Sequence, residues 1–342
     1  MGVERASDKG RLRGLDGIRA MCALFILWGH IPQETFGGWG EINDCRTISL
    51  PILCAYVFFV LSGFLAGYNT QGKIDQQLYY KRRARRILPL YYIYIIACII
   101  VFICIGRSNE VLNPGILYYF LLLPEIPFSI SQGLVPLVHL WFVGVIVLFY
   151  FLYPFYSRIN EKYKCKVAFL FALFWALLKW LLYLLVGKDT FVYRFVGITS
   201  FDCLFLGIWL GTLWRMNNPS VMRIARNRYI CTAAWGLFLC SGIYGNYVPA
   251  PARTEFIAIL AGLLMLNQVS DKPVLPLENK LLKWMSSISF EIYVVHILII
   301  IILSLIYSKA GWHWPSFVIY AVCTLVVIMI SDFCSRLTRI RE

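Results

Sequence analysis

The stretch LDGIRAMCALFILWGH, residues 15–30, is an apolar segment with an arginine near its start and a histidine at its end. Arg19 and His30 are eleven positions apart, about three turns of an α-helix, so both project from one face with roughly 16 Å between their Cα atoms. Ionisable groups inside a membrane segment are costly unless they face a partner or a wet cavity, so we predict a functional pair. The alternative is that depth alone explains both residues, with Arg19 reaching the cytoplasmic headgroups and His30 at the opposite interface.

The composition around this stretch indicates a membrane protein. The chain has 342 residues, 60% of them hydrophobic, and a mean hydropathy of +0.69, well above that of a soluble globular domain. Its net charge of +14 lies in short basic clusters between apolar segments, which indicates membrane topology and no nucleic-acid partner. Most of the eleven cysteines lie in apolar runs without metal-binding spacing, so we expect no metal.

Ten segments are apolar and long enough to cross a bilayer, which takes about 20 residues. Lys and Arg concentrate in alternate loops and in the tail from Arg5 to Arg13, which predicts that both termini are cytoplasmic and that His30 lies toward the outer face. We therefore expect an all-α bundle of about ten transmembrane helices, forming one domain over residues 1–342. The predicted spans are 17–33, 48–68, 87–106, 135–155, 166–186, 194–215, 228–247, 253–268, 287–307 and 316–334.

A basic cluster, KRRARR at residues 81–86, directly precedes the third span. Arg83 and Arg86 share one helix face, and Pro89 fits the first turn of the span. Two guanidinium groups at a helix start suit phosphate recognition. The alternative is that the cluster anchors the chain to anionic lipid headgroups.

Six motifs occur in a fixed order, and together they resemble the acyltransferase 3 family of integral membrane O-acyltransferases over nearly the full length. They are LDGIRAMCALFILWGH at 15–30, FFVLSGFL at 58–65, RRARRILPLYY at 82–92, HLWFVGVIVLFYFLYP at 139–154, FDCLFLGIWLG at 201–211 and ISFEIYVVH at 288–296.

The resemblance implies a ten-helix bundle in a bacterial plasma membrane that moves an acyl group, usually acetyl, from cytoplasmic acyl-CoA to a sugar hydroxyl at the outer face. The acceptor would be a surface or secreted polysaccharide or a glycolipid. In that family the arginine and histidine of the first helix are the critical pair, which here are Arg19 and His30. The resemblance implies donor binding by the family's Arg-x-x-Arg and Ser-Gly-Phe motifs, which here are Arg83 and Arg86, and Ser62, Gly63 and Phe64.

Acyl-CoA is a long ligand with an anionic nucleotide end, so we expect Arg83 and Arg86 to bind its phosphates and Arg19 to guide the pantetheine arm inward. His30 would then be the general base that takes the proton of the acceptor hydroxyl. The role of Gly63 stays open between close approach to the ligand and helix packing by a small residue.

The other ionisable groups of the spans have alternative roles. His139 is a further candidate for acceptor binding, and His296, in the span that also contains Glu291, is a candidate for hydrogen bonding across helices. Asp202 is a candidate for acceptor binding or for orienting His30, and the alternative is a structural pair with Lys179 or Arg194. Asp16 is expected to cap the first helix.

One departure from the family concerns residues 144–148, GVIVL, where many sugar-modifying members have glutamate. Any proton or acceptor contact carried there is therefore in doubt. The rival hypothesis is a transporter or flippase for an anionic glycolipid, which predicts matching broken helices in two halves of the chain. A third hypothesis is an inactive lipid-binding partner, against which Arg19 and His30 argue.

Overall fold

The computed structural model describes residues 12, 14–33, 50–70, 72–244 and 248–339, and its regular structure within these ranges is helical. The basic N-terminal tail and the span residues predicted at 48–49 and 245–247 lie outside the described residues. Within the described ranges, η2 (Ser108–Glu110) and η3 (Val135–Leu140) are 3-10 helices. The α-helices are α1 (Leu15–His30), α2 (Leu50–Asn69), α3 (Gln76–Cys104), α4 (Ile116–Phe120), α5 (Glu125–Ser129), α6 (Trp141–Ser157), α7 (Glu161–Val186), α8 (Phe191–Thr199), α9 (Phe201–Arg215), α10 (Pro219–Arg226), α11 (Arg228–Tyr244), α12 (Ala250–Val269), α13 (Lys280–Ser287), α14 (Ser289–Lys309) and α15 (Ser316–Arg339).

Eight helical segments of the described chain are long and apolar enough to cross a membrane. They correspond to eight of the ten predicted spans, and the other two predicted spans are the shorter helices α1 and α11, with 16 and 17 residues. The protein is therefore an integral, multi-pass, all-helical membrane protein. The count of ten and the sides of the termini stay predictions.

The third span begins earlier than expected. Helix α3 starts at Gln76, where the side chain of Asp75 caps it by accepting a hydrogen bond from the Leu78 amide at 3.1 Å. Pro89 consequently lies inside the helix, so its predicted place in the first turn is wrong. Because the basic cluster is helical, Arg83 and Arg86 are held on the first turns of a 29-residue helix rather than in a loop.

The sixth span is broken. Ser200 adopts a left-handed backbone conformation with φ 42° and ψ 45°, and this residue ends α8 and precedes α9. A residue with this backbone conformation cannot continue a right-handed helix. Asp202 therefore lies in the first turn of a new helix instead of near the middle of a continuous one.

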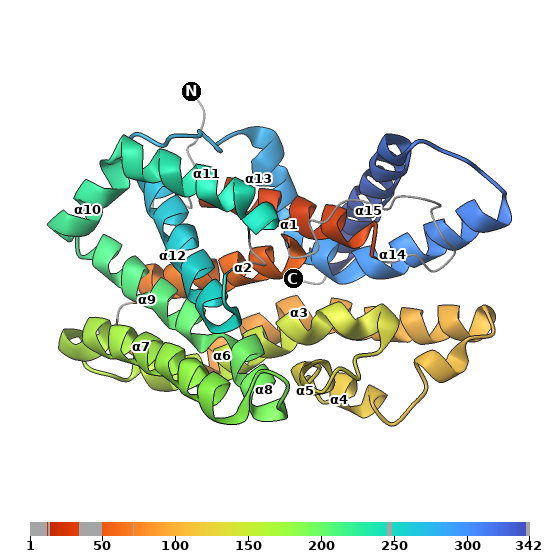
Figure 1. Cartoon of the computed structure of the whole chain (residues 1–342), viewed down its shortest axis with the longest axis horizontal. Coiled ribbons are helices and arrows are strands. Elements are labelled where there is room, and N and C mark those ends of the chain that lie inside the picture. Colours follow the sequence, from red (N-terminus) through yellow and green to blue (C-terminus); the bar gives the residue numbers. More distant parts are fainter. Residues whose placement is uncertain (1–11, 13, 34–49, 71, 245–247, 340–342) are drawn as a thin grey trace.

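Helix α2 lies near the middle of the molecule and packs most extensively against α9 (Figure 1). Glycines make this approach possible, because a Cβ atom at Gly63 would lie 1.9 Å from the Leu204 carbonyl oxygen. On α9, a Cβ at Gly207 would lie 2.1 Å from the Val60 carbonyl oxygen. The two backbones thus meet directly, as small residues allow between membrane helices.

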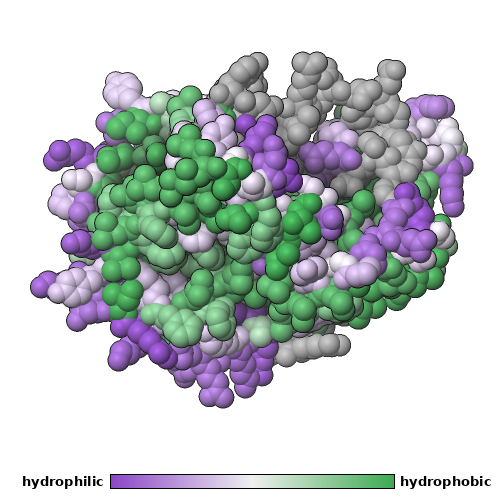
Figure 2. Space-filling view, turned by 60° about the horizontal axis from the view of Figure 1, so that its bottom comes forward, coloured by the Kyte–Doolittle hydropathy of each residue, from purple (hydrophilic) through white to green (hydrophobic). Residues whose placement is uncertain are grey.

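The outer surface carries a broad hydrophobic face with hydrophilic residues gathered at its edges (Figure 2). Helix α7 contributes exposed apolar side chains such as Leu177, Leu184 and Leu185. Helix α15 does the same with Phe317, Leu325 and Met329. Exposed aliphatic surface of this kind suits contact with lipid chains.

Candidate active site

A cavity of about 340 Å³ lies between α1, α2, α3, α6 and α14, and it brings together four of the residues predicted from the sequence. These are Arg19, Ser62, Arg83 and Arg86. The rest of the wall is mostly apolar or aromatic and includes Phe58, Phe142, Phe149, Tyr150, Tyr153 and Tyr293. Three guanidinium groups in a largely uncharged wall have the chemistry that suits an anionic ligand.

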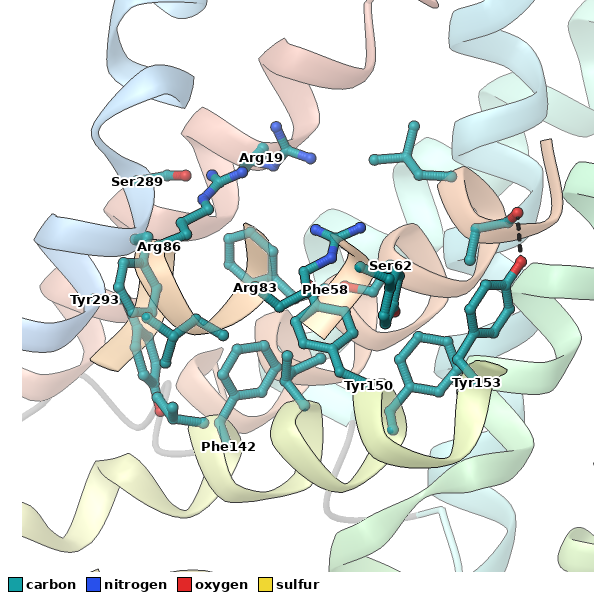
Figure 3. Close-up of a pocket in the computed structure, with 18 of the residues that line it drawn as sticks. Arg19, Phe58, Ser62, Arg83, Arg86, Phe142, Tyr150, Tyr153, Ser289 and Tyr293 are labelled. Atoms are coloured by element: carbon teal, nitrogen blue, oxygen red, sulfur yellow. Dashed lines mark hydrogen bonds between the residues drawn. The ribbon is translucent and has the colours of Figure 1, made fainter. Parts of the chain in front are cut away.

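Aromatic rings hold Arg83 in place. Its guanidinium carbon lies 4.5 Å from the centre of the Tyr150 ring and 5.3 Å from that of Tyr79. Figure 3 shows Arg83 beside Tyr150, with Arg86 on one side of it and Tyr153 on the other. Cation–π contacts on two rings restrict the guanidinium group without neutralising it, so its charge stays available to a ligand.

Arg19 is positioned by the start of its own helix and by α13. Its Nη1 atom lies 3.6 Å from Asp16 Oδ1 and 3.4 Å from Ser286 Oγ, and the Ser286 hydroxyl donates to Asp16 at 2.8 Å. The expectation that Asp16 caps α1 is wrong, because Gly14 is the N-cap residue and makes no side-chain cap. Asp16 is the second residue of α1, in its first turn, where it faces Ser286 and Arg19.

Three histidines from distant parts of the chain form a second cluster, which we call the histidine cluster: His30 on α1, His139 on η3 and His296 on α14. The ring centres of His30 and His296 are 4.9 Å apart, and those of His139 and His296 are 5.0 Å apart. His296 Nε2 lies 3.1 Å from His30 Nδ1. The sequence left the partner of His296 open, and the structure identifies it as His30.

Backbone carbonyls define the tautomers of this cluster. His30 Nδ1 lies 2.9 Å from the Ile26 oxygen, and His296 Nδ1 lies 2.7 Å from the Tyr293 oxygen. A carbonyl can only accept, so both Nδ1 atoms carry hydrogen in the neutral rings. His296 Nε2 is then the acceptor toward His30, and His30 Nε2 keeps its lone pair, as a general base requires.

Tyr293 connects the cavity with the histidine cluster. Its ring lines the cavity, and its centre lies 5.5 Å from the His139 ring and 5.9 Å from the His296 ring. The Tyr293 hydroxyl donates to the His139 carbonyl oxygen. His139 is buried, and its Nε2 hydrogen-bonds the Val294 oxygen at 3.0 Å. The cluster therefore lies behind the wall that Tyr293 forms.

Three other predicted site residues lie elsewhere. Gly63 faces α9, and Phe64 is fully buried beside the same helix, so neither belongs to the residues that line the cavity. The geometry of Gly63 is that of the helix-packing alternative. Asp202 Oδ2 lies 2.5 Å from Lys179 Nζ, which also contacts Glu255 at 2.7 Å. Asp202 is thus part of the structural pair that was the alternative to acceptor binding.

One buried carboxyl was missed from the sequence. Glu125 on α5 is fully buried, and its Oε2 lies where a Cβ atom at Gly144 would come within 2.0 Å. Residues 144–148 contain no acid, yet a carboxyl from a different segment packs against their first residue. The signal was a glutamate in a short apolar stretch after Pro124, which by itself has no distinctive spacing.

Within the described ranges, no group of three or more His, Cys, Asp or Glu side chains is arranged to hold a metal ion. In the histidine cluster, the Nδ1 atoms of His30 and His296 face carbonyl oxygens, and so does Nε2 of His139, so these three nitrogens donate hydrogen bonds.

Comparisons with known proteins agree with the resemblance found in the sequence. YrhL of Bacillus subtilis (strain 168), provisionally named a peptidoglycan O-acetyltransferase, is 24% identical over 88% of this chain and 51% of its own length. The O-acetyltransferase OatA of Staphylococcus aureus is 25% identical over 62% of this chain and 36% of its own length. The acyltransferase MdmB of Streptomyces mycarofaciens is 28% identical over 44% of this chain and 41% of its own length.

The chain thus spans about half the length, or less, of these curated relatives. No solved structure matches it. The family model described as an acyltransferase domain matches residues 12–333. Because this match covers nearly the whole chain, from before Arg19 to beyond His296, the protein belongs to that acyltransferase family.

Proposed function

We propose that this protein is a membrane O-acetyltransferase, which moves an acetyl group from acetyl-CoA bound at the cytoplasmic face to a sugar hydroxyl at the outer face. The names of YrhL and OatA favour a bacterial membrane as the location and a cell-wall glycan as the first acceptor to test. The observation that carries the proposal is the arrangement along α1. Arg19 lines a cavity with two further arginines, and His30, three turns away, has a basic nitrogen in the histidine cluster.

The cavity suits the donor. Arg83 and Arg86 lie on the first turns of α3, next to the basic end of the helix, where they would bind the phosphates of CoA. Arg19, held by Asp16 and Ser286, would bind the polar part of the pantetheine arm. The apolar and aromatic wall toward Phe142 and Tyr293 would exclude water from the thioester.

The chemical step assigns one role to His30. The acceptor hydroxyl attacks the thioester carbonyl carbon, and His30 Nε2 takes the hydroxyl proton as the new C–O bond forms. The C–S bond then breaks, and the leaving CoA thiolate takes the proton from His30. Acetyl ester and CoA thiol are the products, so His30 returns to its neutral state.

The test is acetyl transfer by the purified protein from radiolabelled acetyl-CoA to peptidoglycan fragments and other glycans. We expect His30→Ala to lower kcat by ~10²- to 10⁴-fold, the usual contribution of a positioned general base. His313→Ala is the matched control, because His313 lies in the exposed segment between α14 and α15, outside the cluster. Wild-type protein that neither binds acetyl-CoA nor transfers acetyl would refute the enzyme proposal.

A further inference from the structure

We propose that His296 is a positioning residue for the base: it fixes the tautomer of His30 and, by accepting a hydrogen bond, stabilises the positive charge that His30 acquires during transfer. This inference rests on the proposed function of His30. Its starting point is the contact between His296 Nε2 and His30 Nδ1, which joins α14 to α1 at 3.1 Å.

The orientation of His296 is fixed by its own helix. Its Nδ1 faces two carbonyl oxygens of the preceding turn, Tyr293 at 2.7 Å and Ile292 at 3.2 Å. The proton of the neutral ring therefore stays on Nδ1, and Nε2 is left as an acceptor. The side chain is fully buried, so water does not compete for that acceptor.

Neighbouring rings prevent His296 from turning away. The His139 ring lies 5.0 Å from it in an edge-on arrangement, and the Tyr293 ring lies 5.9 Å away. His139 is tied to α14 through its hydrogen bond to the Val294 oxygen, and Tyr293 is tied to His139 through its hydroxyl. The rings of His139 and Tyr293 thus hold each other in place beside His296 and restrict its rotation.

The consequence falls on His30. Its Nδ1 hydrogen faces both the Ile26 oxygen at 2.9 Å and His296 Nε2, so two acceptors favour the tautomer with a free Nε2. When Nε2 takes a proton, the ring becomes cationic and the Nδ1 hydrogen bond becomes charge-assisted, which strengthens it. In a catalytic triad, a carboxylate accepts the hydrogen bond of the histidine base. A neutral histidine plays that part here, without adding a buried negative charge.

The mutational test compares His296→Leu, which fills the space without an acceptor, with His296→Gln, whose side-chain oxygen can accept from His30. We expect His296→Leu to lower kcat about 10- to 100-fold, the effect of losing one hydrogen bond to a charged group, with the KM for acetyl-CoA unchanged. His296→Gln should recover much of that loss. His313→Leu is the control and should keep wild-type kcat.

The double variant His30→Ala with His296→Leu should be no slower than His30→Ala alone, because a positioning residue acts only through the base. Additive losses, a rise in KM in place of a fall in kcat, or a failure of glutamine to restore activity would each overturn the proposal.

A measurement that needs no turnover separates this inference from the proposed function. In ¹⁵N-histidine NMR of the protein in lipid nanodiscs, the wild type should show His30 protonated at Nδ1. In His296→Leu, that resonance should shift or show a mixture of tautomers. An inactive wild type with this signature would refute the acetyltransferase proposal but keep the positioning contact, whereas an unchanged His30 resonance in His296→Leu would refute the positioning role.

Discussion

At the scale of single residues, Glu125 is unusual, because fully buried carboxyl groups are normally paired. It is fully buried, and neither carboxyl oxygen is hydrogen-bonded to another described residue. Burial raises the pKa of this carboxyl from 4.5 to about 7, against a smaller opposing effect of its own backbone amide. Near neutral pH the folded protein therefore holds a proton that the unfolded chain has released.

This proton makes the free energy of unfolding depend on pH. The folded-state pKa is raised, so stability is lost as pH rises from about 4.5 to 7 and stays lower above that. The full effect is on the order of 3 kcal/mol, because each pKa unit corresponds to about 1.4 kcal/mol. Glu125→Gln mimics the protonated side chain, so we expect it to be more stable than wild type at pH 8 and similar to it below pH 4.5.

Thermal unfolding followed by tryptophan fluorescence in detergent at several pH values would measure this difference. Glu110→Gln is the control, because Glu110 is partly exposed and paired with Arg107. Equal stability of Glu125→Gln and wild type at pH 8 would show that the Glu125 carboxyl finds a compensating partner.

At the scale of secondary-structure elements, the contact between α2 and α9 determines where the site residues lie. Ser62 lines the cavity, while the next residue, Gly63, touches the α9 backbone, so one helix serves both the cavity and the packing interface. Residues one position apart on a helix point in directions about 100° apart, which explains this division. The rotation of α2, and with it the place of Ser62, depends on the glycine contacts.

We therefore expect Gly207→Ala to destabilise the protein by about 1 to 3 kcal/mol, because its Cβ atom would collide with the Val60 carbonyl oxygen and push α2 and α9 apart. Gly236→Ala in α11 is the matched control, since a Cβ atom there meets nothing within 4 Å. Replacing that glycine should leave stability unchanged or raise it by about 0.5 to 1 kcal/mol. Melting temperatures in detergent would compare the two, and a similar change in both would contradict the role of the glycine contact.

At the scale of the whole molecule, the proposed reaction has a donor end and an acceptor end, joined by α1. The arginine-lined cavity lies at one end of α1 and the histidine cluster at the other. Figure 1 shows α14 beside α1, so the two helices that carry His30 and His296 are neighbours in the fold. A donor that enters between the arginines would reach the base only past Tyr293.

This arrangement predicts that Arg83 and Arg86 act on donor affinity. We expect the double variant Arg83→Ala with Arg86→Ala to raise the KM for acetyl-CoA at least about 10-fold, because it removes two charge-assisted contacts to phosphate. The double variant Lys162→Ala with Lys166→Ala is the control, since it removes the same charge from exposed positions at the start of α7. An equal rise of KM in both double variants would show that Arg83 and Arg86 act only through their general positive charge and not through specific contacts to the donor.

The helical, membrane-spanning character of the chain could be predicted from its apolar segments alone, because backbone groups in lipid must be hydrogen-bonded within each segment. The sequence also placed Arg19 and His30 on one helix face, since that relation depends only on helical geometry, and its motif order indicated the family. Which face of each helix meets which neighbour depends on how the helices pack in three dimensions. Helices that are apolar almost all round carry little periodic signal, so the packing of Gly63 on α9, the break at Ser200 and the approach of Glu125 to Gly144 could not be predicted. The contact of His296 with His30 is the clearest case, because 266 residues separate them and only the packing of α14 against α1 brings them together.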